Sequence, residues 1–238
     1  MAVKLGSGDV SFRLGSATPA AVYLGSEQVW TAANPFATLV STKSTANISG
    51  AAQSDTGYIK VEWWDNTEDV YGTGTASLNI SWSKAAGGAG EKTLRIYPSD
   101  ASGNLSGSLT RLGCSNNSLT SLDVSGLTSL GGLFCNNNSL TSLDVSGFTA
   151  LAQLECNNNS LTSLRAVGVP GDPGYGTSAS AYTRPAYAGV MAANNSLDAV
   201  ALDQLYTDLA DNSGGDYSLV FVGGNPGTPG DDPTIATA

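Results

Sequence analysis

Three cysteines are the residues of this chain whose type and regular spacing most directly suggest chemistry. Cys114, Cys135 and Cys156 lie 21 residues apart, and the chain holds no other cysteine and no histidine. Thiolates ligate metals and form disulfides, so a metal site or a disulfide pair is one interpretation. However, the odd count leaves one thiol over, no Cys-x-x-Cys pair occurs, and parallel side chains on neighbouring strands are poorly directed for an S–S bond. We therefore expect three small buried apolar side chains, with no metal ion and no cofactor.

Carboxylates at equivalent positions are the second feature that could carry chemistry. Asp123 and Asp144 are 21 residues apart, and Arg165 takes the third position of the same series. Two converging carboxylates could hold a metal ion or act as an acid and a base on a glycoside. We favour a solvated row in which Arg165 lies next to Asp144. Further acidic residues that could recruit calcium occur without the spacing of a known calcium loop: Asp208, Asp211, Asp216, Asp231 and Asp232.

The cysteines belong to a repeat. The segment Leu112–Gly126 returns as Leu133–Gly147 and again as Leu154–Leu164. A fixed period of about 20 residues predicts stacked coils, each of which buries its apolar edge against the next. One asparagine in each coil should bond backbone groups of the turn that would otherwise be buried without partners. These asparagines are Asn117, Asn138 and Asn159, and the same register extends to Asn195 and Asn225.

The pattern Leu-x-x-Leu-x-Cys-x-x-Asn-x-Leu-x-x-Leu-x-Val-x-x-Leu resembles the leucine-rich repeat family, in a short form with cysteine in the strand. The resemblance is close over residues 105–169, and the extended register gives five coils. It implies a solenoid over residues 99–225, with an insertion at 170–186. A helix at 198–211 is indicated by the residues themselves, because apolar side chains recur there at helical spacing and Asp198 is a suitable N-cap.

Positions that face outward on the predicted strands form the candidate binding surface. One set lies between the leucine and the cysteine of each coil, and another follows the cysteine. The first set includes Gly113, Phe134, Glu155, Met191 and Phe221, and the second includes Ser115, Asn136 and Asn157. Aligned apolar side chains in the open on a rigid face suggest a contact surface, whereas single ones do not. The insertion adds Tyr175, Tyr182 and Arg184, so we expect this surface to bind a protein or a sugar; burial against a neighbouring subunit is the alternative.

Residues 36–98 predict a small antiparallel β-sandwich. The segments Ile59–Trp64 and Leu78–Trp82 alternate between apolar and polar residues, as half-buried strands do. The phrase Val61-Glu-Trp-Trp-Asp-Asn resembles the PKD family of immunoglobulin-like domains, which implies a spacer domain here. Residues 99–108 are interpreted as a short polar joint, with Leu105 expected to cap the first coil of the following domain.

Residues 1–35 contain a smaller repeat, in which Leu-Gly-Ser occurs at Leu5, Leu14 and Leu24. Short apolar runs between these turns predict brief strands, in a unit too small to be stable alone. Together with Val29-Trp30 the segment resembles the N-terminal segments of phage tail and virion proteins. That resemblance implies attachment to other virion proteins and a homo-oligomer in the particle. Residues 226–238 are expected to form an irregular tail rich in proline and glycine.

Composition limits the remaining classes. The net charge is −10 and the few lysines and arginines are scattered, which argues against nucleic-acid binding. No apolar run of about 18 residues occurs, so we expect no membrane insertion. The start of the chain lacks the apolar region of a signal peptide, so we expect synthesis in a host cytoplasm. There is no nucleophile elbow and no phosphate loop, and we expect no enzymatic activity.

The expected fold is therefore mainly β, with an N-terminal segment, a sandwich and a repeat domain. The resemblances imply a non-enzymatic bacteriophage virion surface protein, fibre-like or spike-like, whose repeat domain binds a protein or glycan of the host surface. A purely structural virion component, such as a capsid decoration or a baseplate or tail protein, is one alternative. A bacterial surface adhesin is the other.

Overall fold

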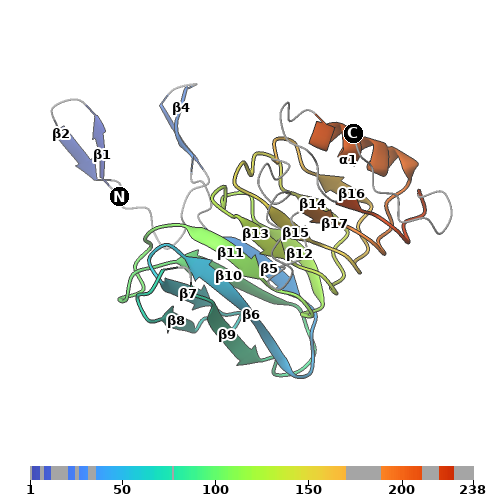
Figure 1. The fold of residues 1–238 in the computed structure, drawn as a ribbon. Coiled ribbons are helices and arrows are strands. Elements are labelled where there is room, and N and C mark those ends of the chain that lie inside the picture. Colours follow the sequence, from blue (N-terminus) through green and yellow to red (C-terminus); the bar gives the residue numbers. More distant parts are fainter. Residues whose placement is uncertain are drawn as a thin grey trace, which may run out of the picture. The chain divides into compact units, whose positions relative to one another are not determined.

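The computed structural model of the chain is mainly β (Figure 1). It describes residues 2–5, 8–11, 21–24, 27–31, 36–76, 78–169, 189–210 and 220–227. Two compact units are present, Met1–Asn34 and Pro35–Ala238. The candidate insertion at 170–186 and most of the tail at 226–238 lie outside the described residues.

The first unit contains two antiparallel hairpins. In one, β1 (Ala2–Leu5) pairs with β2 (Gly8–Ser11). In the other, β3 (Ala21–Leu24) pairs with β4 (Glu27–Thr31). Each is a separate two-stranded sheet, and an isolated two-stranded sheet is marginally stable at best in water.

The second unit holds the remaining elements. Residues 36–98, here called the antiparallel region, contain β5 (Ala37–Ser41), β6 (Asn47–Ser54), β7 (Tyr58–Glu62), β8 (Glu68–Gly72), β9 (Ile80–Ala85) and β10 (Lys92–Pro98). Residues 109–225, here called the repeating region, contain β11 (Leu109–Gly113), β12 (Leu119–Asp123), β13 (Gly132–Phe134), β14 (Ser142–Asp144), β15 (Gln153–Glu155), β16 (Ser163–Arg165), β17 (Gly189–Met191), α1 (Ala199–Ala210) and β18 (Val220–Phe221).

These strands form two large sheets around one buried core. The five-stranded sheet has the order β12-β5-β10-β7-β8, and the seven-stranded sheet has the order β18-β17-β15-β13-β11-β6-β9. A further two-stranded sheet, β14-β16, continues the stack of coils next to β12. Alternate residues of β7 and β10, such as Val61 and Leu94, are buried, and they belong to the same apolar cluster as Trp82 of β9 and Leu133 of β13.

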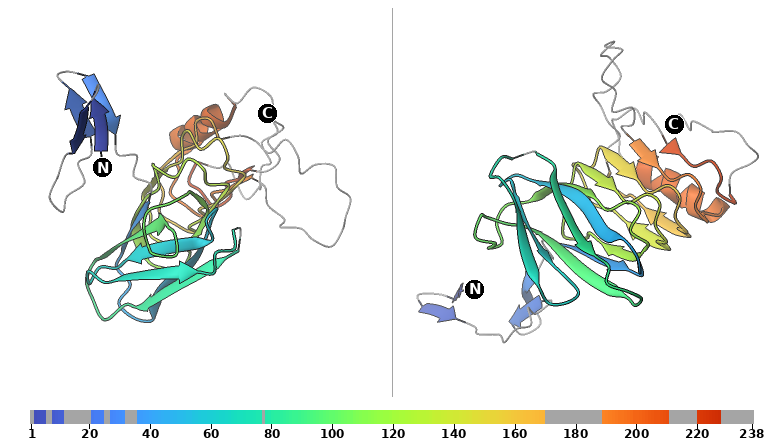
Figure 2. Two further views of the ribbon diagram at one scale, coloured as in Figure 1. Left: turned by 90° about the vertical axis from the view of Figure 1, so that its left-hand side faces the viewer. Right: turned by 90° about the horizontal axis from the view of Figure 1, so that it is seen from below.

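The antiparallel and repeating regions share both sheets. Strand β6 pairs antiparallel with β11, and β5 pairs antiparallel with β12. The sequence predicted two domains separated by a joint at 99–108, but here the strands of one region continue directly into the sheets of the other (Figure 2). Leu105, expected to cap the first coil, is 55% exposed, and β5 and β6 cover that end of the repeats instead.

The repeating region is built from parallel strands in register. Leu112 pairs with Leu133, Leu133 with Leu154, and Leu154 with Val190, and all four side chains are buried. The three cysteines, which follow two residues after these leucines, are fully buried and form no disulfide. Sulfur here occupies the place of a small apolar side chain in the core.

A ladder of asparagine side chains links each coil to the one before it. The Asn138 amide donates to the Cys135 carbonyl of its own coil at 2.9 Å and to the Cys114 carbonyl of the preceding coil at 3.1 Å. Its Oδ1 accepts from the backbone N–H groups of Asn117 and Leu119, at 2.9 and 3.0 Å. The carbonyl bonds to the same coil and to the preceding one recur at Asn159, Asn195 and Asn225.

The same ladder joins the repeats to the antiparallel region. Asn117, the first rung, donates to the Ser49 carbonyl at 2.7 Å and accepts from the Ser49 N–H at 3.0 Å. Ser41, buried on β5, donates its hydroxyl to the Asn117 carbonyl at 2.6 Å. Strand β6 therefore occupies, for Asn117, the position that a preceding coil occupies for every later rung.

The backbone conformation also restricts which residue type can precede each ladder asparagine. It is Asn in four coils and Gly224 in the last, always with a positive φ. Asparagine tolerates this left-handed conformation better than other non-glycine residues. The asparagines concerned are Asn116 (φ 62°), Asn137 (56°), Asn158 (55°) and Asn194 (54°).

Helix α1 packs beside β16 through one buried carboxylate. Asp208 accepts from Arg165 Nε at 2.7 Å, from the Ala166 N–H at 3.0 Å and from Gln204 at 2.8 Å. Burial alone would raise the pKa of Asp208, but these hydrogen bonds outweigh it and lower the pKa. Arg165 lies in register with Asp144, as expected, yet its ion-pair partner is Asp208, which sequence reasoning had considered for calcium.

A matched pair of substitutions tests the ladder. Asn138→Ala leaves the N–H groups of Asn117 and Leu119 without their acceptor and removes one of the two asparagine donors from the Cys114 and Cys135 carbonyls. We expect it to lower the free energy of unfolding by about 3 kcal/mol. Asn137→Ala removes a left-handed asparagine at the surface together with its exposed hydrogen bond from the Asn158 amide, and should cost about 1 kcal/mol. Urea denaturation followed by circular dichroism measures both values; equal losses would show that the ladder contributes nothing of its own.

Thiol reactivity tests the packing of the cysteines. Burial raises the pKa of Cys114 and of Cys156 to about 12, and it raises the pKa of Cys135 as well. Because the thiolate is the reactive species, we expect no labelling by a disulfide reagent in the folded protein even at pH 9, and labelling of all three after denaturation. Rapid labelling of any thiol in the native state would contradict this packing.

Candidate functional site

A row of outward-facing residues crosses the seven-stranded sheet. Strand pairing places Gly113 beside Phe134, Phe134 beside Glu155, Glu155 beside Met191 and Met191 beside Phe221. This set, here called the outer row, comprises the residues that the repeat register aligned between leucine and cysteine. The backbone beneath it is held on both sides, because the N–H of each following cysteine donates to the carbonyl of the row residue in the next coil, as Cys114 does to Phe134 at 2.8 Å.

Phe134 packs with Arg111 over a glycine. A Cβ added to Gly132 would lie 3.0 Å from the Phe134 ring and 3.2 Å from Arg111 Nε, so both side chains fill the space that this glycine leaves. The Arg111 guanidinium carbon stands 4.9 Å from the ring centroid, close enough for a cation–π contact. Its terminal nitrogen donates to Gln153 Oε1 at 2.7 Å. Arg111 thus packs against Phe134, and Gln153 holds the Arg111 guanidinium; sequence reasoning selected neither residue.

The outer row is less open than expected. Phe134, Glu155 and Met191 are half-buried, whereas the sequence predicted apolar side chains standing in the open. Contact with Arg111 and Gly132 accounts for this at Phe134. Asn136 and Asn157, in the neighbouring row, are also half-buried, and Asn136 accepts a hydrogen bond from Ser115.

The outer row continues onto the antiparallel region. Gly113 pairs with Ala51 of β6, and Ala51 pairs with Ser81 of β9. In the adjacent row, Arg111 pairs with Gln53, whose amide donates to Asn79 at 3.0 Å. The repeat pattern could not predict this extension of the sheet. The first repeat begins at β11, so the pattern says nothing about β6 and β9.

Several predicted site residues lie outside what the structure describes. Tyr175, Tyr182 and Arg184 of the insertion fall in residues 170–188. For Phe221 the backbone is described and the side chain is not. The candidate surface is therefore defined by the residues from β9 to β17.

The acidic residues considered for a metal or catalytic site bond to the backbone of their own turns. Asp123 and Asp144 accept hydrogen bonds from the N–H groups of Ser125 and Ser146, at 3.0 and 2.9 Å, as turn residues do. Within the described ranges, no group of His, Cys, Asp and Glu side chains is placed to hold a metal ion. Helix α1, with 12 residues, is the helix of the described part, and it is neither long nor apolar enough to cross a bilayer.

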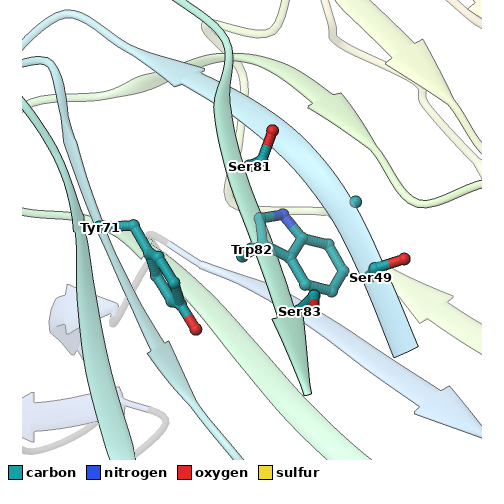
Figure 3. A pocket seen from close by; sticks show the side chains of 6 residues that line it. Ser49, Tyr71, Ser81, Trp82 and Ser83 are labelled. Atoms are coloured by element: carbon teal, nitrogen blue, oxygen red, sulfur yellow. The ribbon is translucent and has the colours of Figure 1, made fainter. Parts of the chain in front are cut away.

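A hollow of about 490 Å³ opens where β8 and β9 form the outer edges of the two sheets. Its lining residues are Ser49, Gly50, Tyr71, Ser81, Trp82 and Ser83. Figure 3 shows Trp82 extending from β9 toward β6, with Tyr71 of β8 on the other side of β9. Ser81 and Ser83 of the same strand are exposed, whereas Trp82 is buried. Ser81 belongs both to the hollow and to the extension of the outer row.

Comparison of the chain with protein-family models, curated proteins and solved structures gives no match.

Proposed function

We propose that the chain is a non-enzymatic bacteriophage virion surface protein that recognises a host surface structure with the outer face of its seven-stranded sheet. In this proposal the repeating region is a leucine-rich-repeat solenoid, and the antiparallel region is an immunoglobulin-like sandwich that caps it. Parallel strands at a period of 21 residues, joined by the ladder of asparagines, support the first assignment. Two facing sheets with alternating burial support the second.

The observation that carries the proposal is the rigid placement of Phe134 on the outer row. Arg111, Gln153 and the gap at Gly132 hold its ring in one position, and the backbone ladder holds the strand below. A side chain already ordered in the free protein loses little entropy on binding, which makes such a face suitable for recognition. Aromatic and arginine side chains are also those that most often dominate binding energies.

The charge of this face favours an uncharged partner. Arg111 and Glu155 are its charged residues between β11 and β17, and they balance. The whole chain carries a net charge of −10, which repels nucleic acids and other polyanions at long range. A neutral glycan, or a protein surface with little charge, therefore fits the outer row better than a polyanion does.

Attachment to the particle is assigned to residues 1–35. Their two hairpins are each two-stranded sheets, which rarely persist without a neighbour that covers their apolar side. Other virion proteins, or further copies of this chain in a homo-oligomer, would supply that cover.

A structural role in the virion is the second candidate. The half-burial of Phe134 and Met191 would also suit a contact that becomes fully buried against a neighbouring subunit. The two roles differ in whether the outer row is free on the intact particle.

Substitution on the outer row tests host recognition. We expect Phe134→Ser and Arg111→Ala to lower the binding of fluorescently labelled full-length protein to host cells at least tenfold, while unfolding midpoints change little because both residues are half-buried at the surface. Val167→Ser is the matched control, since Val167 is 37% exposed in the same region but lies off the row.

Flow cytometry on a panel of candidate host bacteria gives the readout. Unchanged cell binding by both variants would remove the outer row from recognition. Normal cell binding combined with loss of the protein from purified particles would instead assign the row to assembly.

A further inference from the structure

A line of planar polar side chains runs beside the outer row on the seven-stranded sheet. Strand pairing places Gln53 of β6 beside Arg111 of β11. Beyond Arg111 follow Gly132 of β13 and Gln153 of β15, and Asn79 extends the line through its hydrogen bond with Gln53. Each member lies two residues along its strand from its counterpart in the outer row, and therefore on the same face. The four polar residues, Asn79, Gln53, Arg111 and Gln153, are here called the planar row.

The planar row keeps hydrogen-bonding capacity that no other described residue uses. Gln53 and Asn79 share one bond of 3.0 Å, so an NH₂ group and a carbonyl oxygen of this pair remain in either orientation of the amides. Arg111 donates one N–H to Gln153, and a guanidinium carries five. The ion pairs of the described residues include neither Arg111 nor Glu155 of the outer row. The face thus offers a cation that only donates, a carboxylate that only accepts, and amides that do both.

Apolar side chains are sparse on this face. Phe134 and Met191 of the outer row are half-buried, whereas Ala51 and Gly113 add little bulk between them and β9. A Cβ added to Gly113 would meet only backbone atoms of Ala51, at 3.4 Å or more, so no described side chain fills the space that this glycine leaves. The surface therefore combines an aromatic ring with a long polar stretch, and it lacks the contiguous apolar centre of a typical contact between proteins.

We propose that the planar row and the outer row together bind a neutral oligosaccharide that lies across the strands from β15 to β9. One sugar ring places a C–H face against Phe134, and its hydroxyl groups accept from Arg111 and donate to Glu155. The next units follow the planar row toward Gln53 and Asn79. The inference rests on the proposed function, and it names the partner of the outer row as a glycan rather than a protein.

Hydroxyl groups match these side chains because each hydroxyl both donates and accepts. Arg111 supplies donors alone and Glu155 supplies acceptors alone, and a hydrogen bond to a charged group is stronger than one between neutral groups. A guanidinium or an amide also presents two polar atoms in one plane, which suits two neighbouring hydroxyls of a sugar ring. Phe134 adds apolar contact area beside them.

Two other partner classes suit the face less well. A polyanion would meet one cation close to one carboxylate, on a chain of net charge −10. A protein surface would bury Arg111 and Glu155, and burial of a charge is costly unless the partner supplies an opposite charge and hydrogen bonds at the matching position. A sugar leaves both charged groups partly in water and still bonds them.

Nuclear magnetic resonance on the full-length protein tests sugar binding without reference to a host. In the ¹⁵N-labelled chain, the Arg111 Nε–H signal is the arginine signal that Arg111→Lys removes. Titration with neutral tetrasaccharides (maltotetraose, cellotetraose, mannotetraose and chitotetraose) at millimolar concentration should shift this signal until it saturates, because the guanidinium gains acceptors. The Arg165 signal is the internal control, since that Nε–H is already bonded to Asp208. If none of these sugars shifts the Arg111 signal, the proposal is wrong.

Variants measure how far the bound chain extends along the sheet. Gln53 lies two strands from Phe134, about 10 Å away, beyond the reach of one sugar unit held at the ring. We expect Gln53→Ala to weaken binding of the active tetrasaccharide about fivefold and to leave the matching monosaccharide unchanged, as measured from the shift of the Phe134 backbone N–H. Equal tetrasaccharide affinities for Gln53→Ala and the wild type would overturn the path along the planar row.

Two further variants test the chemistry of the contact. Arg111→Lys keeps the positive charge and loses the planar group, so it should weaken both sugars about tenfold. Val167→Ser, off both rows, should change neither affinity. Full affinity in Arg111→Lys would show that charge alone suffices and would contradict the planar contact.

Treatment of the host cells separates this inference from the proposed function. Sodium periodate cleaves vicinal diols of sugars, and proteinase K removes surface proteins. We expect periodate to lower the cell binding of the labelled protein at least tenfold and proteinase K to leave it unchanged. The reverse result would overturn the glycan and leave host recognition in place. Tetrasaccharide binding without binding to any cell would instead support the sugar site and overturn the proposed function.

Discussion

The structure depends on an asparagine amide at the turn of every coil, which is buried at Asn117, Asn195 and Asn225 and half-buried at Asn138 and Asn159. Each ladder asparagine uses both ends of its side chain, with Nδ2 bonding two carbonyls and Oδ1 accepting from the backbone, as at Asn138. Carbonyls and N–H groups at these turns point into the core, where each would be costly if left unpaired. No other uncharged side chain offers two donors and an acceptor on so short a stem, because glutamine adds a rotatable bond. The apolar columns supply the driving force for stacking, and the asparagines fix the register in which the coils stack.

The same interaction explains why the antiparallel region and the repeats form one unit. Ser49 of β6 presents its N–H and carbonyl to Asn117 as a preceding coil would, and β5 closes the other side through Ser41. Both sheets therefore run through the junction without an exposed edge, and the first coil needs no separate cap. A continuous sheet also gives the outer face its length, because β9 and β6 extend the row that begins in the repeats. Exposed edges remain at β8 and β9, and the hollow with Trp82 lies between these two strands.

Much of the repeating region could be predicted from sequence, because its period aligns equivalent residues. The register of Phe134, Glu155 and Met191, the burial of the cysteines and the helix capped by Asp198 all follow from spacing alone. The predicted mainly β fold is confirmed.

The repeat period gives no information about contacts between residues that lie far apart in the sequence. The second half of β6, Gly50–Ser54, has little intrinsic strand propensity and forms a strand because β9 and β11 pair with it on both sides. Arg165 was assigned to Asp144 by proximity in the repeat, but the carboxylate of Asp208 reaches it from a helix that the repeat does not contain. Arg111 and Gln153 could have been noticed as the residues that flank Gly132 in the same outward column, yet the bond between them and the contact of Arg111 with Phe134 depend on the side-chain rotamers.

Native-state hydrogen exchange measures most directly whether one ladder holds the two regions together. Four backbone N–H groups donate to successive ladder asparagines: those of Ser49, Leu119, Leu140 and Leu161. If the ladder is continuous, all four should open with the same free energy, because none can lose its bond until the unit unfolds as a whole. Exchange of Ser49 at a clearly lower free energy than the three leucines would show that the antiparallel region opens independently, and the account of a single unit would be wrong.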